Sequence, residues 1–91
     1  MLQLHHAFPK YLGGAADQVL VELQRSVHEA YHAGLDQLLP RRAGTAYYQA
    51  LSPEGTANVF QQLGAFTKQF DAEYGTQLYD ALLQNGFPGG P

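Results

Sequence analysis

The chain contains no cysteine, few charged residues and no long hydrophobic segment. The absence of cysteine excludes disulfides, thiolate metal sites and a cysteine nucleophile. Imidazole and carboxylate groups remain as metal ligands, and these suit Zn, Ni, Mn or Mg. No hydrophobic run approaches the about 18 residues of a membrane span, and no segment has the pattern of a signal peptide.

Charge is scarce and unevenly distributed along the chain. The formal net charge is −3, which argues against nucleic-acid binding by bulk charge alone. Residues 1–44 nevertheless hold four basic and four acidic groups, whereas residues 45–91 hold one basic group and four acidic ones. The first half is therefore neutral, and a divalent cation bound there would make it positive.

Length and composition predict one globular domain. Ninety-one residues are too few for two independent cores, and 45% of them are hydrophobic. Because Met1 stands directly before an apolar stretch and a histidine pair, we expect the chain to be the C-terminal piece of a longer protein. An intact small protein is the alternative.

The four histidines form two tight groups, and their spacings suit a metal site. His5 and His6 are neighbours, so on a strand their side chains point to opposite faces. His28 and His32 are four residues apart, so on a helix they project from one face. One histidine of the first pair can then join the helix pair around a single divalent ion, while the other faces a substrate.

The first half of the chain predicts two strands and a helix. A short strand is expected over residues 3–7, a glycine loop over residues 9–14, and a second strand over residues 19–21. The first turns of a helix are the alternative for that third segment. Residues 24–39 have helical periodicity, and Pro40 ends this helix. The predicted buried stripe of the helix consists of Val27, Tyr31, Leu35 and Leu38.

Three further helices are expected after a turn at residues 41–44. The first covers residues 45–51, and the second begins at Ser52-Pro53, an N-cap followed by proline, and runs to about residue 73. Thr76 is the predicted N-cap of the last helix, which Asn85-Gly86 ends. Residues 87–91 are predicted to form a loose tail.

The order of strand, glycine loop, strand and helix, with these histidines, resembles the ββα-metal (His-Me finger) fold of the HNH endonuclease superfamily. More narrowly, it looks like the LHH-type nuclease domains at the C-termini of bacterial polymorphic toxins, and it is similar in plan to the nuclease domains of DNase colicins. The resemblance covers residues 3 to about 39. It rests on Leu4-His5-His6, Pro9, Gly13-Gly14 and the Arg25-x-x-His28-x-x-x-His32 helix.

This resemblance implies an α+β fold in which residues 1–39 form the ββα-metal unit and residues 40–86 form a helical elaboration. It implies a metal-dependent endonuclease, a hydrolase of phosphodiester bonds, with DNA as the expected substrate and RNA as the alternative. His5, His28 and His32 take the positions of the metal ligands, and His6 takes that of the general base. Three imidazoles leave a coordination position open, and an imidazole with a pKa of about 6.5 can accept a proton from water.

One departure from the family pattern concerns the support of the general base. The family usually has an asparagine in or just before the second strand, which holds the general-base region in place. No asparagine lies between His6 and His28. Gln18, which keeps an amide, is the predicted substitute in this catalytic support role, and Asp17 is the other candidate.

Four cationic side chains are candidates for binding the substrate phosphates: Lys10, Arg25, Arg41 and Arg42. For Arg25 a salt bridge to Glu22 or Glu29 is the alternative. The resemblance further implies the toxic domain of a secreted effector, delivered into the cytoplasm of a target bacterium and held by a cognate immunity protein. Two rivals stay open: a non-enzymatic, metal-stabilised helical module that binds a protein partner, and a nuclease-like domain without activity.

Overall fold

The computed structural model describes residues 2–18 and 20–88. These residues contain two short strands, two 3-10 turns and four α-helices. The predicted small α+β fold is confirmed, with helix as the predominant structure. No helix within these residues is both long and apolar enough to cross a membrane. In chain order the elements are β1 (Leu2–His5), η1 (Lys10–Leu12), β2 (Val21–Gln24), α1 (Arg25–Leu38), η2 (Arg41–Ala43), α2 (Thr45–Gln49), α3 (Pro53–Tyr74) and α4 (Leu78–Gln84).

β1 and β2 form an antiparallel pair in which His5 lies opposite Val21. The first strand was predicted to reach residue 7 but ends at His5, because its pairing with β2 stops where His5 lies opposite Val21. Beyond it, the backbone N–H and C=O of Phe8 bond to the Gln18 side chain. The second strand lies at Val21–Gln24, later than the predicted residues 19–21, and Val19 is outside the described residues. Pairing with β1 and burial of Leu23 determine this position.

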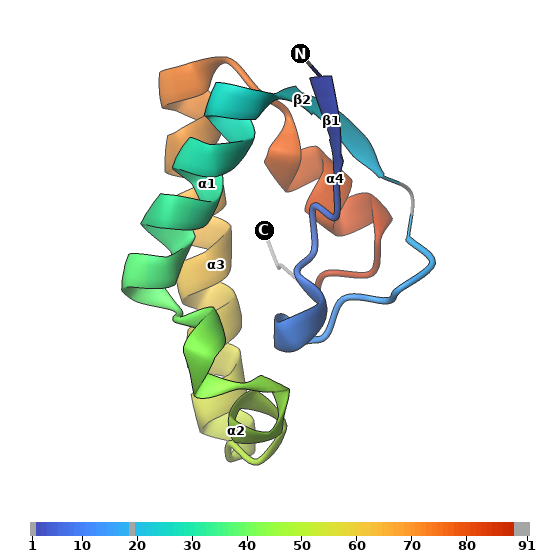
Figure 1. The fold of residues 1–91 in the computed structure, drawn as a ribbon. Helices are drawn as coiled ribbons and strands as arrows, with labels where there is room; N and C mark the ends of the chain where they lie inside the picture. Colours follow the sequence, from blue (N-terminus) through green and yellow to red (C-terminus); the bar gives the residue numbers. More distant parts are fainter. Residues whose placement is uncertain (1, 19, 89–91) are drawn as a thin grey trace.

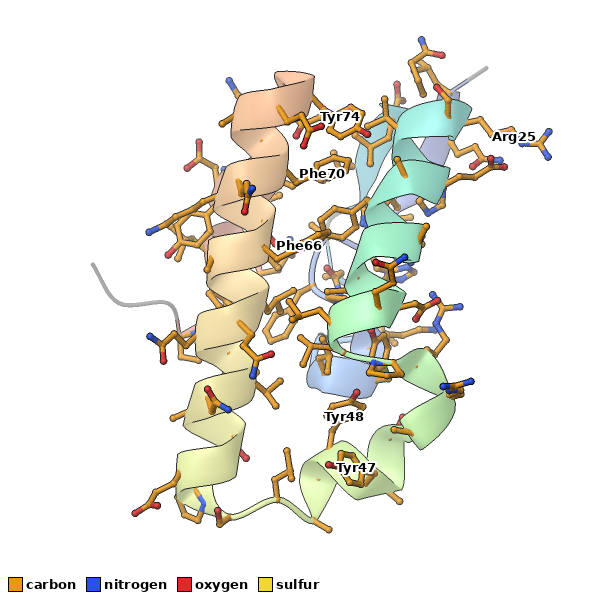
Figure 2. The ribbon with its side chains drawn as sticks, turned by 90° about the vertical axis from the view of Figure 1, so that its left-hand side faces the viewer. Arg25, Tyr47, Tyr48, Phe66, Phe70 and Tyr74 are labelled. Carbon is orange, nitrogen blue, oxygen red and sulfur yellow. The ribbon has the colours of Figure 1, made fainter. Side chains whose placement is uncertain are left out.

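The two long helices, α1 and α3, run beside each other, and Phe66, Phe70 and Tyr74 of α3 point toward α1 (Figures 1 and 2). Tyr31 and Leu35 of the predicted α1 stripe are buried. Leu38 is exposed, and Leu39 is buried in its place, because the helix ends at Leu38 and the chain turns there. The Tyr31 ring meets the Phe70 ring at 5.0 Å between centroids, which closes the helix pair around an aromatic core.

The start of α3 is confirmed and the start of α4 is corrected. The Ser52 hydroxyl accepts a hydrogen bond from the Gly55 N–H at 3.1 Å, as expected of an N-cap before proline. Thr76 does not cap α4. The Asp71 carboxylate of α3 accepts from the N–H groups of Leu78 and Tyr79 at 2.8 and 2.9 Å, so a neighbouring helix provides the cap.

Phe87 does not belong to a loose tail, because its side chain is 6% exposed. Its ring lies 5.6 Å from that of Phe8 and 5.7 Å from that of Phe60. Gly86, with φ of 87°, turns the chain back onto the core, a conformation that glycine adopts without strain. Residues 89–91 of the predicted tail are outside the described residues.

Candidate metal centre

The strand β1 and the helix α1 bring the two histidine groups together. Alternation along β1 leaves Leu2 and Leu4 exposed and directs His5, which is 2% exposed, to the buried face. Gln3 lies on the same face as His5, and its Oε1 accepts a hydrogen bond from Nδ1 of His28 at 2.8 Å. The hairpin continues directly into α1. The hydrogen bond between Gln3 and His28 holds the first turns of this helix against β1.

The predicted convergence of His5, His28 and His32 is confirmed. One ligand nitrogen from each ring lies within 4.8 Å of the others. The ring centroid of His5 lies 4.7 Å from that of His28 and 5.1 Å from that of His32. The three imidazoles therefore form a single cluster that could hold one ion.

His5 supplies the test of whether the cluster fits an ion. Its Nε2 is buried and has no hydrogen-bond partner among the described residues. An unpaired buried polar atom costs about 1–3 kcal/mol, so a native structure normally provides a partner. Burial, and after it the neighbouring His32 and His28 rings, lower the pKa of His5 to about 3. The ring is therefore neutral near pH 7, so one of its two nitrogens has a lone pair that a cation can bind.

His32 has hydrogen-bond partners at both ring nitrogens. Its Nε2 lies 2.9 Å from Nε2 of His28, and its Nδ1 lies 3.1 Å from Nη2 of Arg41. Burial is the main cause that lowers the pKa of His32, followed by His28 and Arg41. Arg41 thus joins the cluster, an arrangement that the sequence did not predict.

The cluster forms the wall of an open pocket of about 470 Å³. His6 is half-buried, lies outside the triad and lines this pocket together with His5. Two of the four predicted cations, Lys10 and Arg41, line it as well. The full lining is Leu4, His5, His6, Pro9, Lys10, Tyr11, His28, His32, Arg41, Gly44 and Thr45.

The other two predicted cations are not part of the pocket lining. The Arg25 Nε donates to Glu29 Oε1 at 2.9 Å, and both side chains are 65% exposed. Figure 2 shows Arg25 extending away from the body of the protein at the start of α1. The alternative of an ion pair with Glu29 therefore describes Arg25. Arg42 is exposed and follows Arg41 in η2.

Gln18 supports the loop that follows His6 and does not line the pocket. Its Oε1 accepts from the Phe8 N–H at 3.0 Å, and its Nε2 donates to the Phe8 carbonyl at 2.7 Å. A Cβ atom at Gly14 would lie 2.0 Å from that carbonyl, so the loop requires glycine there. Asp17, the other candidate, is exposed. The amide thus acts on the backbone two residues after His6.

Two residues support the site from outside the triad, and the sequence did not predict the first of them. Gln3 orients His28, and its place two residues before His5 on a strand was the available signal. Tyr11 donates its hydroxyl to the Leu39 carbonyl at 2.7 Å, and its ring lies 5.9 Å from the Arg41 guanidinium carbon. Burial raises the pKa of Tyr11 to about 12, so the hydroxyl remains a donor.

The chain thus brings together three imidazoles with an unpaired buried nitrogen, a fourth imidazole and two cations, all at one pocket. This combination suits a divalent ion that keeps positions open toward the pocket. Comparison with family models, with curated proteins and with solved structures found no match for the chain.

Proposed function

We propose that this domain is a metal-dependent endonuclease of the HNH type, with DNA as its substrate. The observation that carries this proposal is the unpaired, buried Nε2 of His5 beside His28 and His32. Nitrogen ligands of this kind favour Zn or Ni over Mg, which prefers oxygen. In this proposal the hairpin and α1 form the ββα-metal unit, and the later helices support it.

The residues around the pocket have distinct roles in the proposed hydrolysis. His5, His28 and His32 hold the ion, which when bound stabilises negative charge on the phosphate and on the leaving oxygen. His6 accepts a proton from the attacking water as general base. The water oxygen forms a bond to phosphorus as the bond from phosphorus to the 3′ oxygen breaks. Lys10 and Arg41, which line the pocket, bind phosphate oxygens.

Gln18 takes the part that an asparagine has in the family. Its two hydrogen bonds to Phe8 hold the backbone two residues after His6, and the bond to the Ala15 carbonyl at 2.8 Å ties both sides of the loop. A general base must be held within hydrogen-bond reach of its water, so a fixed loop favours catalysis. The missing asparagine therefore does not argue for an inactive domain.

The biological role follows from the family resemblance alone. We infer a toxic domain of a secreted bacterial effector, which acts on nucleic acid in the cytoplasm of a target cell. A cognate immunity protein would protect the producer.

The test is cleavage of supercoiled plasmid with Zn, Ni, Mn or Mg, beside a His6→Ala variant. We expect nicking by the natural sequence with at least one ion and none with excess chelator. The His6→Ala variant should cleave at least about a hundredfold more slowly, because a general base contributes that much. An RNA substrate in parallel assays distinguishes the alternative. Equal cleavage by His6→Ala would reject the base, and no cleavage with any ion or substrate would reject the function.

A further inference from the structure

We propose that Arg41 is bound to His32 only while the triad is free of metal, and that metal binding releases its guanidinium to the substrate phosphate. This inference rests on the proposed function and adds a coupling between the ion and the substrate. It follows from the number of hydrogens that each ring nitrogen can carry.

In the metal-free cluster, hydrogen bonds run in one donor-to-acceptor direction from Arg41 through His32 and His28 to Gln3. A guanidinium only donates, so Nδ1 of His32 accepts from Arg41 at 3.1 Å. The single ring hydrogen of neutral His32 is then on Nε2, which donates to Nε2 of His28 at 2.9 Å. The ring hydrogen of His28 is on Nδ1 and is donated to Oε1 of Gln3 at 2.8 Å.

His28 is ready for an ion in this state, and His32 is not. Nε2 of His28 is an acceptor, and Nε2 of His5 has no partner among the described residues that would hold a hydrogen on it. His32 carries its hydrogen on the nitrogen that faces His28. A ligand nitrogen needs its lone pair, so His32 must transfer this hydrogen to Nδ1 before Nε2 can coordinate.

Arg41 cannot keep its bond to His32 once this transfer has occurred. An Nδ1–H group would face an Arg41 N–H group, and two donors do not form a hydrogen bond. Coordination through Nδ1 would displace the guanidinium as well, because the ion would use the same lone pair. His32 therefore binds either Arg41 or the ion, and no group changes its charge in the exchange.

The released guanidinium remains at the pocket. The Arg41 N–H donates to Asp36 Oδ1 at 3.1 Å, so the backbone of η2 is anchored while the side chain moves. The ring of Tyr11 lies beneath the guanidinium carbon at 5.9 Å, and Lys10 and His6 line the same pocket. A phosphate oxygen pair is the acceptor that suits the paired donors of arginine.

The first test reads the ring hydrogens directly. Long-range ¹H–¹⁵N spectra of the histidine rings, recorded near pH 7.5 with and without Zn, distinguish Nδ1–H from Nε2–H. We expect His32 to change from Nε2–H to Nδ1–H when Zn is added, and His28 to have Nδ1–H in both states. If His32 has Nδ1–H before Zn is added, the exchange is wrong although the metal centre stands. If His32 does not respond to Zn, both proposals fail.

The second test compares two adjacent arginines with the same change of charge. Arg41→Gln replaces a donor by a group whose amide oxygen can accept from Nδ1–H of His32. Arg42→Gln removes one charge next to it without touching the triad. Calorimetry should show about tenfold tighter Zn binding by Arg41→Gln than by Arg42→Gln, since a competing charged hydrogen bond is gone. Equal affinities, or weaker binding by Arg41→Gln, would overturn the exchange.

The same two variants test whether the released Arg41 guanidinium binds DNA. Zn should strengthen binding of a short DNA duplex to the natural sequence and to Arg42→Gln, measured by fluorescence anisotropy. In Arg41→Gln this gain should fall by at least about fivefold, because the released guanidinium is missing. An undiminished gain would show that Arg41 does not bind phosphate, whereas the plasmid assay tests the endonuclease itself.

Discussion

His5 combines almost complete burial with a ring nitrogen that has no partner among the described residues. Three neighbouring rings contact it: Tyr31 at 5.4 Å, His28 at 4.7 Å and His32 at 5.1 Å between centroids. Such packing retains a neutral imidazole and opposes a charged one, because burial removes the water that would stabilise the charge. The same property that favours metal binding makes the metal-free protein sensitive to acid.

The lowered pKa of His5 determines how the stability of the metal-free protein changes with pH. The pKa of His5 falls from its ordinary value of 6.5 to about 3, by burial first and then by His32, His28, His6 and Arg41. Between these pH values the unfolded chain binds a proton that the folded chain does not. The free energy of unfolding of the metal-free protein should therefore decrease as pH falls from 6.5 toward 3. The lowered pKa of His32 acts in the same direction.

Urea unfolding of the metal-free protein at pH 7.5, 6.5, 5.5 and 4.5 measures this effect. His5→Phe is the matched variant, because it keeps a ring against Tyr31 and has no titrating group. Its stability should decrease less between pH 6.5 and 4.5 than that of the natural sequence. Parallel curves for the two proteins would mean that His5 is not the group responsible.

The helix histidines should be needed for metal affinity and not for folding. His28→Ala and His32→Ala should each weaken Zn binding by at least about tenfold, since each removes a ligand. Alanine favours helix, so the circular dichroism of α1 should be preserved. Ser26→Ala, at an exposed position of the same helix, is the control. Unchanged affinity in calorimetric titrations would remove these residues from the site.

At this scale the sequence predicted the triad and missed its surroundings. The convergence of His5 with His28 and His32 followed from local periodicity, the alternation of a strand and the four-residue repeat of a helix. The contact between Arg41 and His32 depends on how the chain turns after α1, which no local rule provides. For Arg25 the choice between Glu29 and a substrate stayed open, because an exposed arginine has many rotamers of similar energy.

At the scale of elements, the loop between β1 and β2 is held by one side-chain amide. Gln18 satisfies both backbone groups of Phe8, and Gly14 allows the close approach. His5 is fixed separately by the pairing of β1 with β2. The loop and the strand therefore position the proposed base and the proposed ligand independently.

Gln18→Glu should separate these two functions. The carboxylate can still accept from the Phe8 N–H, but it would face the Phe8 carbonyl with no donor, so the loop should loosen. We expect cleavage to slow by about tenfold or more while Zn affinity changes by less than about twofold. Asp17→Asn, an exposed neighbour, controls for local charge. An equal loss of Zn affinity would show that the loop supports the ligands too.

Element boundaries show where local signals stop. Apolar β-branched residues indicated a second strand near residues 19–21, but the partner strand sets the register and places it at Val21–Gln24. Thr76 matched the local rule for an N-cap, but Asp71 from the preceding helix accepts from the Leu78 and Tyr79 N–H groups at the start of α4. Ser52 was predicted correctly because its cap lies within its own helix start.

At the scale of the whole molecule, the core does not consist of the metal cluster. Figure 1 shows the hairpin at one end of the α1–α3 pair and α2 at the other, and α4 packs against α3. Leu63, Leu78 and Leu82 of α3 and α4 are almost fully buried, and Phe87 joins them. This apolar core follows from the helical periodicity of the sequence, whereas burial of Phe87 depends on a turn that the sequence did not reveal. The fold therefore has a source of stability that needs no ion.

Metal removal distinguishes the proposed enzyme from a metal-stabilised binding module. A module whose folding depends on the ion should lose its helices in chelator. This protein should keep its helical circular dichroism, because α1, α3 and α4 pack on an apolar core. Zn at about one hundred times its Kd adds about 2.7 kcal/mol, which raises the Tm by roughly 10–20 °C for a domain of this size. Thermal unfolding of metal-free and Zn-loaded protein measures both quantities, with His28→Ala as the variant that should respond least. A metal-free protein without cooperative unfolding would favour the module, since the ion would then be required for the fold itself.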